Sequence, residues 1–344
     1  MKLRAGTRKS PLAMAQTYMV LDMIKAAFPE CDTEIVTFTT KGDRQLDKIG
    51  GKGVFVTEIE QALQSGEIDF AVHSAKDLPV TLGEGLEISG VCPRGNYRDM
   101  LVTKKSVVFN DSDVFTVGTG SQRRRGGFAR LYPNAKFADI RGNVGTRLKK
   151  LSDGLYDGII LCAAGTERLG LSLSEYEVKE FEHWELLPAP CQAIIAVECA
   201  KESKAAKIIS QVSHKETMLR FETEREVIRL LGADCTVPVG AYSEINGEKI
   251  SLTVSDGKGH FAQGEKEIEK RINKIKCSQS EVVECFRKTT ERRFELPKEY
   301  NDEKKMTRYF EYCFEYGKKL ENTKYLKKRI EELSKENFSD GKII

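Results

Sequence analysis

Short apolar runs alternate with helical patterns along the first third of the chain. The runs have the length of buried strands and are bounded by glycine, proline or charged residues. We predict strands at Lys2–Thr7, Glu34–Thr39, Ile68–Val72 and Leu86–Val91. Leu12, Ala15, Met19 and Met23 share one helical face before Pro29, and Glu58–Ser65 forms a second helix that ends at Gly66. This β-α-β order predicts a mostly parallel sheet.

A second α/β unit follows an interruption at Cys92–Asn96, a candidate hinge. Its predicted strands are Phe115–Gly118, Lys136–Ile140 and Gly158–Leu161, and its predicted helices are Arg123–Leu131 and Val144–Leu151. The stretch Leu187–Gln192 marks a second crossing, after which Ile194–Cys199 and the helix Lys204–Val212 return to the first sheet. Two crossings predict two lobes with a cleft between them.

The rest of the chain predicts a small α+β third domain and a charged tail. A long helix from His214 to about Leu231 leads through a loop to strands at Val239–Glu244 and Ile250–Val254. Amphipathic helices beyond Pro297 could pack on the third domain or on a second subunit. The predicted domains are 1–94 with 194–212, then 98–187, then 214–296, followed by a helical extension at 297–344.

Composition narrows the class of protein. The 344 residues are 40% apolar and 31% charged, and a net charge of +3 argues against wholesale binding to nucleic acid. No run of about 18 apolar residues is present, and the chain starts in a strand pattern, so we expect a cytoplasmic protein that does not bind membranes. Nine scattered cysteines without a Cys-x-x-Cys pair argue against disulfides and against a metal site.

Asp77 follows the predicted strand Ile68–Val72 in the stretch His73–Pro79. Ligands of open α/β sheets bind beyond the carboxyl ends of such strands, which makes Asp77 a candidate for chemistry. The alternative is that Asp77 only starts a turn before Leu78 and Pro79, which aspartate does often.

Arginine clusters follow three predicted strands of the second unit. They are expected in the loops at the carboxyl ends of these strands, in the stretches Gly118–Arg125, Arg141–Arg147 and Glu167–Gly170. A single arginine run is usually a solvated face, but three clusters at the ligand end of one sheet indicate a site for a polyanion. Arginine pairs two-on-two with carboxylate or phosphate, so Asp77 would face a cationic field from the other lobe.

Two loops offer further candidate chemistry. Ser10 and Pro11 fit the start of a helix, where free backbone N–H groups beside Arg8 could hold an anion, although Ser10 could equally be only a cap. The stretch Lys48–Gly53 lacks the spacing of a nucleotide P-loop, so we interpret it as a lid that includes Lys48, Lys52 and Phe55. Cys235, in the loop after the long helix, is in the kind of position where cysteines are mostly inert.

Five motifs in order resemble the hydroxymethylbilane synthase family, also called the porphobilinogen deaminases. They are Thr7–Ala13, Gly51–Phe55, His73–Pro79, Arg141–Arg147 and Cys235–Gly240, and the likeness spans about Arg4 to Val254. The resemblance implies two lobes like those of periplasmic binding proteins and a third domain. It implies condensation of four porphobilinogens into the linear tetrapyrrole hydroxymethylbilane, with release of ammonia, in heme biosynthesis.

The resemblance also implies roles for individual residues. A dipyrromethane cofactor would be joined to Cys235 through a thioether, and Asp77 and Lys76 would be the catalytic pair. The residues implied to bind the cofactor and substrate carboxylates are Arg8, Ser10, Lys76, Thr119, Ser121, Arg123, Arg124, Arg141, Gly142, Arg147 and Arg168. The product would pass to uroporphyrinogen III synthase, and we expect a monomer.

Two other classes would use parts of this sequence. A non-catalytic two-lobed anion-binding protein would share the fold but would need neither Asp77 nor Cys235. A nucleic-acid binder could use Arg123–Arg125, but no aromatic residues interleave with that run.

Overall fold

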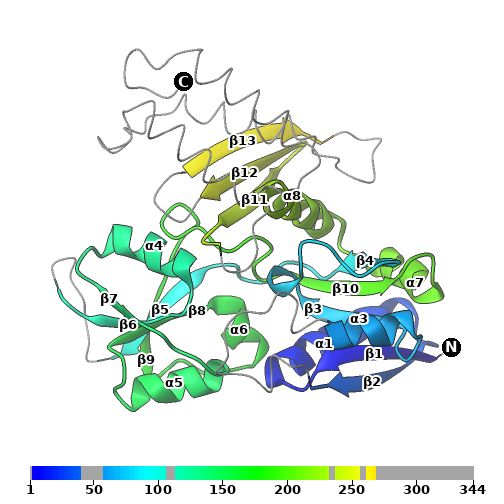
Figure 1. Cartoon of the computed structure of the whole chain (residues 1–344), viewed down its shortest axis with the longest axis horizontal. Helices are drawn as coiled ribbons and strands as arrows, with labels where there is room; N and C mark the ends of the chain where they lie inside the picture. The colour runs from blue at the N-terminus through cyan, green and yellow to red at the C-terminus, as the bar shows by residue number, and fades with distance from the viewer. Residues whose placement is uncertain (1, 40–56, 106–112, 232–236, 256–260, 269–344) are drawn as a thin grey trace.

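The computed structural model describes residues 2–39, 57–105, 113–231, 237–255 and 261–268. Over these ranges the chain forms two five-stranded sheets, one three-stranded sheet and the helices that cover them. Figure 1 shows the two larger sheets side by side, with the smaller sheet above them. The predicted α/β fold with two lobes and a smaller α+β part is confirmed.

The first lobe is a sheet in the order β2-β1-β3-β10-β4. Its strands are β1 Lys2–Arg8, β2 Asp32–Phe38, β3 Phe70–Ser74, β4 Leu86–Val91 and β10 Ile195–Ala200, and its helices are α1 Pro11–Ala27, α3 Thr57–Gln64 and α7 Lys204–Val212. Only β10, the strand that returns from the second lobe, runs antiparallel to its neighbours. The mostly parallel sheet and the return of the chain to it are therefore confirmed.

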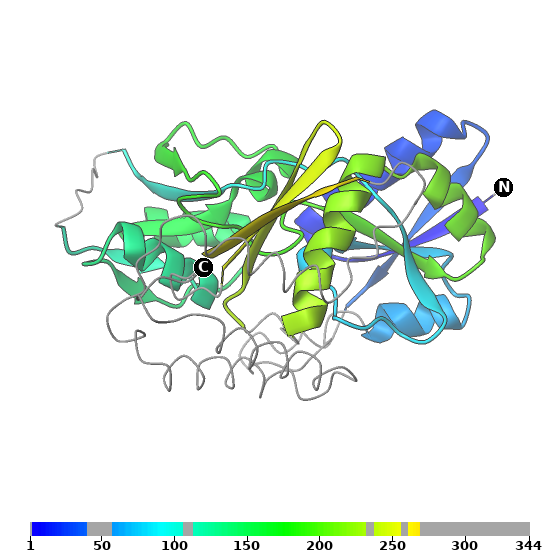
Figure 2. The same cartoon turned by 90° about the horizontal axis from the view of Figure 1, so that it is seen from above.

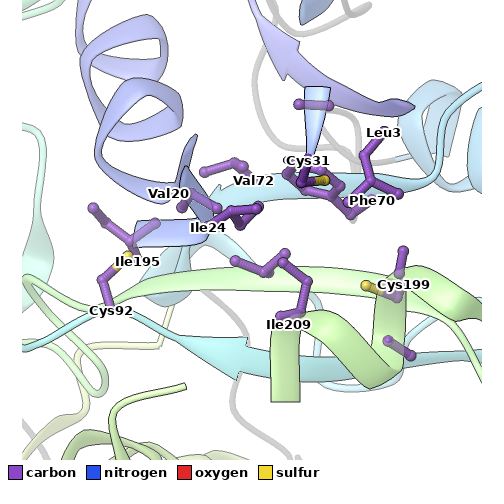
Figure 3. Close-up of a cluster of buried hydrophobic side chains, with 14 residues drawn as sticks. Leu3, Val20, Ile24, Cys31, Phe70, Val72, Cys92, Ile195, Cys199 and Ile209 are labelled. Atoms are coloured by element: carbon purple, nitrogen blue, oxygen red, sulfur yellow. The ribbon is translucent and has the colours of Figure 1, made fainter. Parts of the chain in front are cut away.

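The core of the first lobe lies where α1 and α7 pack on one face of this sheet (Figure 3). Val20 and Ile24 of α1 meet Phe70 of β3 and Ile209 of α7, and all four are fully buried. Burying an aliphatic or aromatic side chain of this size stabilises a fold by about 1.5–3 kcal/mol. On the opposite face, α3 contributes a second cluster that also fixes β3.

The second lobe repeats the same arrangement in the order β7-β6-β8-β5-β9. Its strands are β5 Asp99–Lys104, β6 Thr116–Gly118, β7 Lys136–Ala138, β8 Gly158–Cys162 and β9 Tyr176–Glu180, and its helices are α4 Gln122–Leu131, α5 Val144–Ser152 and α6 Ala163–Arg168. Again the antiparallel strand, here β5, is the one that enters from the other lobe. Each lobe thus receives its antiparallel strand through one of the two crossing segments.

The third part packs one helix against a hairpin and a further strand. Its elements are α8 Lys215–Leu231, β11 Gly240–Asn246, β12 Lys249–Ser255 and β13 Phe261–Glu267, and its strands are antiparallel. Val227 of α8 packs on the sheet, whereas Phe221 of the same helix packs against the first lobe. Figure 2 shows α8 passing between this sheet and the first lobe.

Three strands and one helix were not predicted from the sequence: β5, β9, β13 and α6. The last of these corrects the position of Arg168, which we expected in a loop and which is the final residue of α6. No helix among the described residues is both long and apolar enough to span a membrane.

Candidate functional site

Asp77 ends a short 3-10 turn, Ala75–Asp77, that follows the buried strand β3. Ala75 and Leu78 on either side are buried, whereas the Asp77 side chain is exposed and Lys76 is half-buried. With the described residues, the Asp77 carboxylate makes no hydrogen bond or ion pair. The packing of its neighbours therefore fixes the backbone of the turn, while the carboxylate stays exposed.

The strand that leads to Asp77 is held from both sides. The Ala75 N–H donates to Ile194 O at 2.9 Å, which ties the turn to the crossing segment before β10. Buried His73 Nε2 lies 3.0 Å from Glu198 Oε2 of β10, on the adjacent strand. The turn thus starts from the rigid centre of the first sheet.

Helix α1 is tied to the end of β3, because Gln16 Nε2 donates to Ser74 Oγ at 3.0 Å, and its predicted cap is confirmed. Ser10 Oγ accepts a hydrogen bond from Ala13 N at 3.3 Å, and Pro11 opens the helix. Arg8 is the last residue of β1. Helix α1 contacts α6 of the second lobe, and these helices follow β1 and β8, so the carboxyl ends of the two sheets come together.

Thr119 and Ser121 shape the loop between β6 and α4. Ser121 Oγ accepts from Arg124 N at 3.4 Å and caps α4, while Thr119 Oγ1 accepts from Ser121 N at 3.2 Å. Each hydroxyl therefore has a local structural task, and a contact to a ligand stays a prediction.

Arg123 and Arg124 are buried around the carboxylate of Asp99, the first residue of β5. Arg123 Nη1 lies 2.8 Å from Asp99 Oδ2, and Arg124 Nη2 donates to Asp99 Oδ1 at 2.8 Å. Burial alone would raise the pKa of Asp99, but the two guanidinium groups hold it at about 2. One carboxylate cannot neutralise two guanidinium groups, so this buried cluster keeps a positive charge.

The loop before α5 contains Arg141 and Gly142, and Arg147 lies in the first turn of α5. Gly142 has φ of 111°, where a Cβ atom would lie 2.7 Å from Thr146 Cγ2, so this backbone requires glycine. Its carbonyl oxygen accepts from Arg147 Nε at 2.8 Å, which orients that guanidinium group. Arg141 is exposed.

Arg168 lies between the two crossing segments. Its Nη2 donates to Ala193 O at 2.6 Å, and a Cβ atom built on Gly95 would lie 3.1 Å from the same nitrogen. Burial lowers the pKa of Arg168, and burial together with the charge of Arg124 lowers the pKa of Arg147. Neither arginine pairs with a carboxylate within the ranges that the structure describes.

These arginines suit a ligand that carries carboxylates. Arg147 and Arg168 are partly buried cations whose pKa values are lowered, which means that their charge is incompletely compensated. A bound carboxylate would supply the negative counter-charge and accept hydrogen bonds from the N–H groups that remain. The donor set therefore fits a dipyrromethane whose rings carry acetate and propionate groups.

Cys235, Lys48, Lys52 and Phe55 lie outside the described residues, so their predicted roles stay predictions. Among the cysteines that are described, Cys31, Cys92, Cys191 and Cys199 are buried, and Cys162 is half-buried. Burial raises the pKa of Cys92 to about 11 and that of Cys199 to about 12, and it raises the pKa of Cys191 further. These buried thiols are therefore poor nucleophiles at neutral pH.

The sequence did not single out the polar residues that join the lobes to α8. Fully buried Glu224 of α8 accepts from Arg94 Nη1 at 2.6 Å, from Cys191 N at 2.6 Å and from Ser243 N at 2.8 Å. Gln192 continues this network, because its Nε2 donates to Asp99 Oδ1 at 3.0 Å and its carbonyl oxygen accepts from Arg94 Nε. The only advance signal was the position of Arg94 and Gln192 in the two crossing segments.

Comparisons with known proteins cover most of the chain. A family model for the porphobilinogen deaminase dipyromethane cofactor binding domain matches residues 3–208, and one for the porphobilinogen deaminase C-terminal domain matches residues 218–285. The porphobilinogen deaminase of Streptococcus sanguinis is 41% identical over 258 residues, which are 73% of this chain and 84% of that protein. A probable porphobilinogen deaminase of Methanocaldococcus jannaschii is 42% identical over 251 residues, or 71% of this chain and 84% of that protein.

One solved structure that is similar to the chain is the substrate binding protein of an amino acid ABC transporter. It is 14% identical, with a TM-score of 0.35, over 66% of this chain and 95% of that chain.

Proposed function

Because the chain belongs to the porphobilinogen deaminase family, we propose that it acts as a hydroxymethylbilane synthase of the transferase class. It is an enzyme of porphyrin biosynthesis, and its cofactor is dipyrromethane. The reaction joins four porphobilinogens head to tail. Each addition breaks the bond to an amino group, which leaves as ammonia, and forms a carbon–carbon bond to the preceding pyrrole, which loses a proton.

The charges at the carboxyl ends of the two sheets support this proposal. Asp77 presents an exposed carboxylate after β3, while arginines follow β6, β7 and β8 in the other lobe. The dipyrromethane cofactor supplies the covalently held pyrrole end to which the first substrate is added. Asp77 balances the positive charge that develops on an incoming porphobilinogen as ammonia leaves, and its Oδ atoms can hold a proton. Lys76, beside it, belongs to the same proposed catalytic pair.

The arginines hold the carboxylates of substrate and cofactor in this proposal. Arg141, Arg147 and Arg168 have N–H groups suited to two-pronged contacts, and Arg8 joins them from the first lobe. Arg123 and Arg124 contribute mainly through the positive charge of their buried cluster with Asp99, because their guanidinium groups are already engaged there. The loops around these arginines contain Ser10, Thr119, Ser121 and Gly142.

Cys235 is the proposed point of thioether attachment, and Lys48, Lys52 and Phe55 belong to the proposed lid. We further propose the domain limits given above, a monomeric state, a cytoplasmic location and product handover to uroporphyrinogen III synthase.

Intact-mass spectrometry of the purified protein tests the proposal. We expect the mass of the polypeptide plus one dipyrromethane, consumption of porphobilinogen, and a Cys235→Ser variant with bare polypeptide mass and no turnover. Cys162→Ser, which removes the half-buried described thiol, is the control and should keep the added mass. A parent protein of bare mass that consumes no porphobilinogen would support an anion-binding protein instead, and added mass on Cys235→Ser would contradict the attachment site.

A further inference from the structure

Arg225 of α8 reaches from the third part of the molecule to the turn that carries Asp77. Its Nη1 donates to Leu78 O at 3.2 Å, and its Nη2 donates to Pro79 O at 2.5 Å and to Val80 O at 2.9 Å. One guanidinium group therefore binds three consecutive carbonyl oxygens, starting at the residue after Asp77. Within the described residues Arg225 makes no ion pair with a carboxylate, and these carbonyl oxygens accept its hydrogen bonds.

The surroundings of Arg225 fix its orientation. Phe221 lies one helical turn earlier, with its ring centroid 5.9 Å from Arg225 Cζ. The same Phe221 ring packs in a cluster with Ala75 and Leu78, the buried residues on either side of Lys76 and Asp77. Residues four apart share one face of a helix, so Phe221 and Arg225 contact the Asp77 turn from the same face of α8. Phe221 packs on its buried side chains, and Arg225 binds its backbone.

Helix α8 also leads to the predicted attachment cysteine. Arg225 lies six residues before the helix end at Leu231, about 9 Å along the axis at 1.5 Å per residue, and Cys235 follows four residues later. The opposite side of α8 is anchored on its own sheet through Val227. One helix thus carries a direct anchor for the Asp77 turn and is followed along the chain by Cys235.

We propose that Arg225 is a positioning residue, which holds the Asp77 carboxylate in register with the group attached beyond α8. This inference rests on the proposed function and deepens it. Arg225 acts through the backbone of Leu78, Pro79 and Val80, so it affects the placement of Asp77 and contributes no contact of its own to substrate. A displacement of about 1 Å in a catalytic group can cost about a hundredfold in rate.

The test compares Arg225→Gln with the matched control Arg229→Gln. Arg229 lies one turn further along α8, and within the described residues its ion pair is with Glu226 of the same helix, so its loss should change little. For Arg225→Gln we expect the same covalent cofactor mass as the parent, a kcat lowered by about tenfold to a hundredfold, and a KM within about twofold. Hydrogen exchange should become faster in residues 75–82 and stay unchanged in β1 and α1.

Arg225→Lys provides a second variant that keeps the positive charge. An ammonium group can bind one of these carbonyl oxygens but cannot reproduce the planar fork, so kcat should lie between those of the parent and of Arg225→Gln. If Arg225→Gln matches the parent both in turnover and in hydrogen exchange over residues 75–82, the proposal is wrong. Faster exchange across the whole first lobe would also overturn it, because Arg225 would then serve general stability.

Failure of the proposed function gives a different result. If the parent protein carries no dipyrromethane and shows no turnover, the proposed function and the positioning role are both wrong. Exchange in residues 75–82 would still report whether Arg225 anchors the turn.

Discussion

Asp77 is exposed because the residues around it are buried. Ala75 and Leu78 insert into a cluster with Ile194 and Phe221, so the backbone between them is held in place. The point from which the carboxylate projects is therefore set before any ligand arrives. Catalysis by a fixed charge depends on this preorganisation, since no further reorganisation is needed when charge develops in the substrate.

Replacing Asp77 by Asn should lower kcat by about two to three orders of magnitude and leave the fold and the attached cofactor intact. The amide has nearly the same shape but cannot balance a positive charge. Porphobilinogen consumption and intact mass are the measurements, and Asp22→Asn, at an exposed position of α1, is the control. Activity of Asp77→Asn within a fewfold of the parent would show that Asp77 is only a turn residue.

The conformation of a single residue was predictable from the sequence where neighbouring residues alone determine it. Ser10 was predicted as a helix cap, and the structure confirms it, because the cap depends on neighbouring backbone alone. Cys191 and Ala193 could not be predicted in the same way. Their φ angles of 60° and 67° are imposed by contacts of the crossing segment with Glu224 and Arg168, which lie far away in the sequence.

Among helices and strands, predictability followed the strength of the local pattern. Helices α1, α5 and α7 each begin after a serine or asparagine cap, and their predicted starts agree with the structure. Strand β9, Tyr176–Glu180, was missed because charged residues alternate along it and it lies at a sheet edge. Strand β5 was missed although it is buried, because its place is set by pairing with β8 and β9.

The start of α5 offers a paired test of backbone strain. Gly142→Ala should destabilise the protein by about 1–3 kcal/mol, since it combines a left-handed φ with a Cβ atom only 2.7 Å from Thr146 Cγ2. Gly145→Ala, three residues on, meets only Asn143 Oδ1 at 3.6 Å, so it should be neutral or stabilise α5 by up to about 1 kcal/mol. Urea denaturation measures both, and equal midpoints for the two variants would contradict the assigned strain.

Asp99, the first residue of β5, should make the stability of the fold depend on pH in acid. The pKa of Asp99 is about 2, below the usual value of 3.8, so its ionised form stabilises the fold above pH 4, and this contribution is lost as pH falls toward 2. The loss amounts to about 1 kcal/mol at pH 3 and about 2 kcal/mol at pH 2. Asp99→Asn should remove this part of the pH dependence.

The same variant should also lower stability at pH 7, by about 3–5 kcal/mol, because two buried guanidinium groups lose their counter-charge. Urea midpoints between pH 5 and pH 3 measure the effect, with Asp139→Asn as the control, since Asp139 forms a largely exposed pair with Arg125. A parent and an Asp99→Asn variant with parallel pH profiles would refute the assignment.

The molecule as a whole is held together by a polar junction as well as by apolar packing. A hydrogen-bonded path runs from Glu224 of α8 through Arg94 and Gln192 of the crossing segments to Asp99 of the second lobe. No local pattern could predict these contacts, because the partners are up to 130 residues apart. The lobes and the two segments that cross between them were predictable from the repeated α/β units, and the side-chain contacts that join them were not.

Glu224→Gln tests this junction, because one substitution alters contacts to all the segments that meet there. The amide leaves buried Arg94 without a counter-charge and turns an N–H donor toward groups that themselves donate, Cys191 N or Ser243 N. We expect a loss of about 3–5 kcal/mol in the free energy of unfolding. Glu226→Gln, two residues further along α8, breaks the pair with Arg229, which is the ion pair that Glu226 makes among the described residues, and should cost about 0.5 kcal/mol or less.

Urea denaturation, followed both by circular dichroism and by limited proteolysis, separates local from global effects of Glu224→Gln. If the junction couples the parts, proteolysis should first cut the crossing segments near Arg94 and Gln192, at urea concentrations where Glu226→Gln is still intact. Adding Arg94→Met to Glu224→Gln should then cost much less than the sum of the single changes, since the second change removes the charge that the first left unpaired. Strictly additive losses would mean that Arg94 and Glu224 stabilise their own segments independently, and that the lobes and α8 are joined by apolar packing alone.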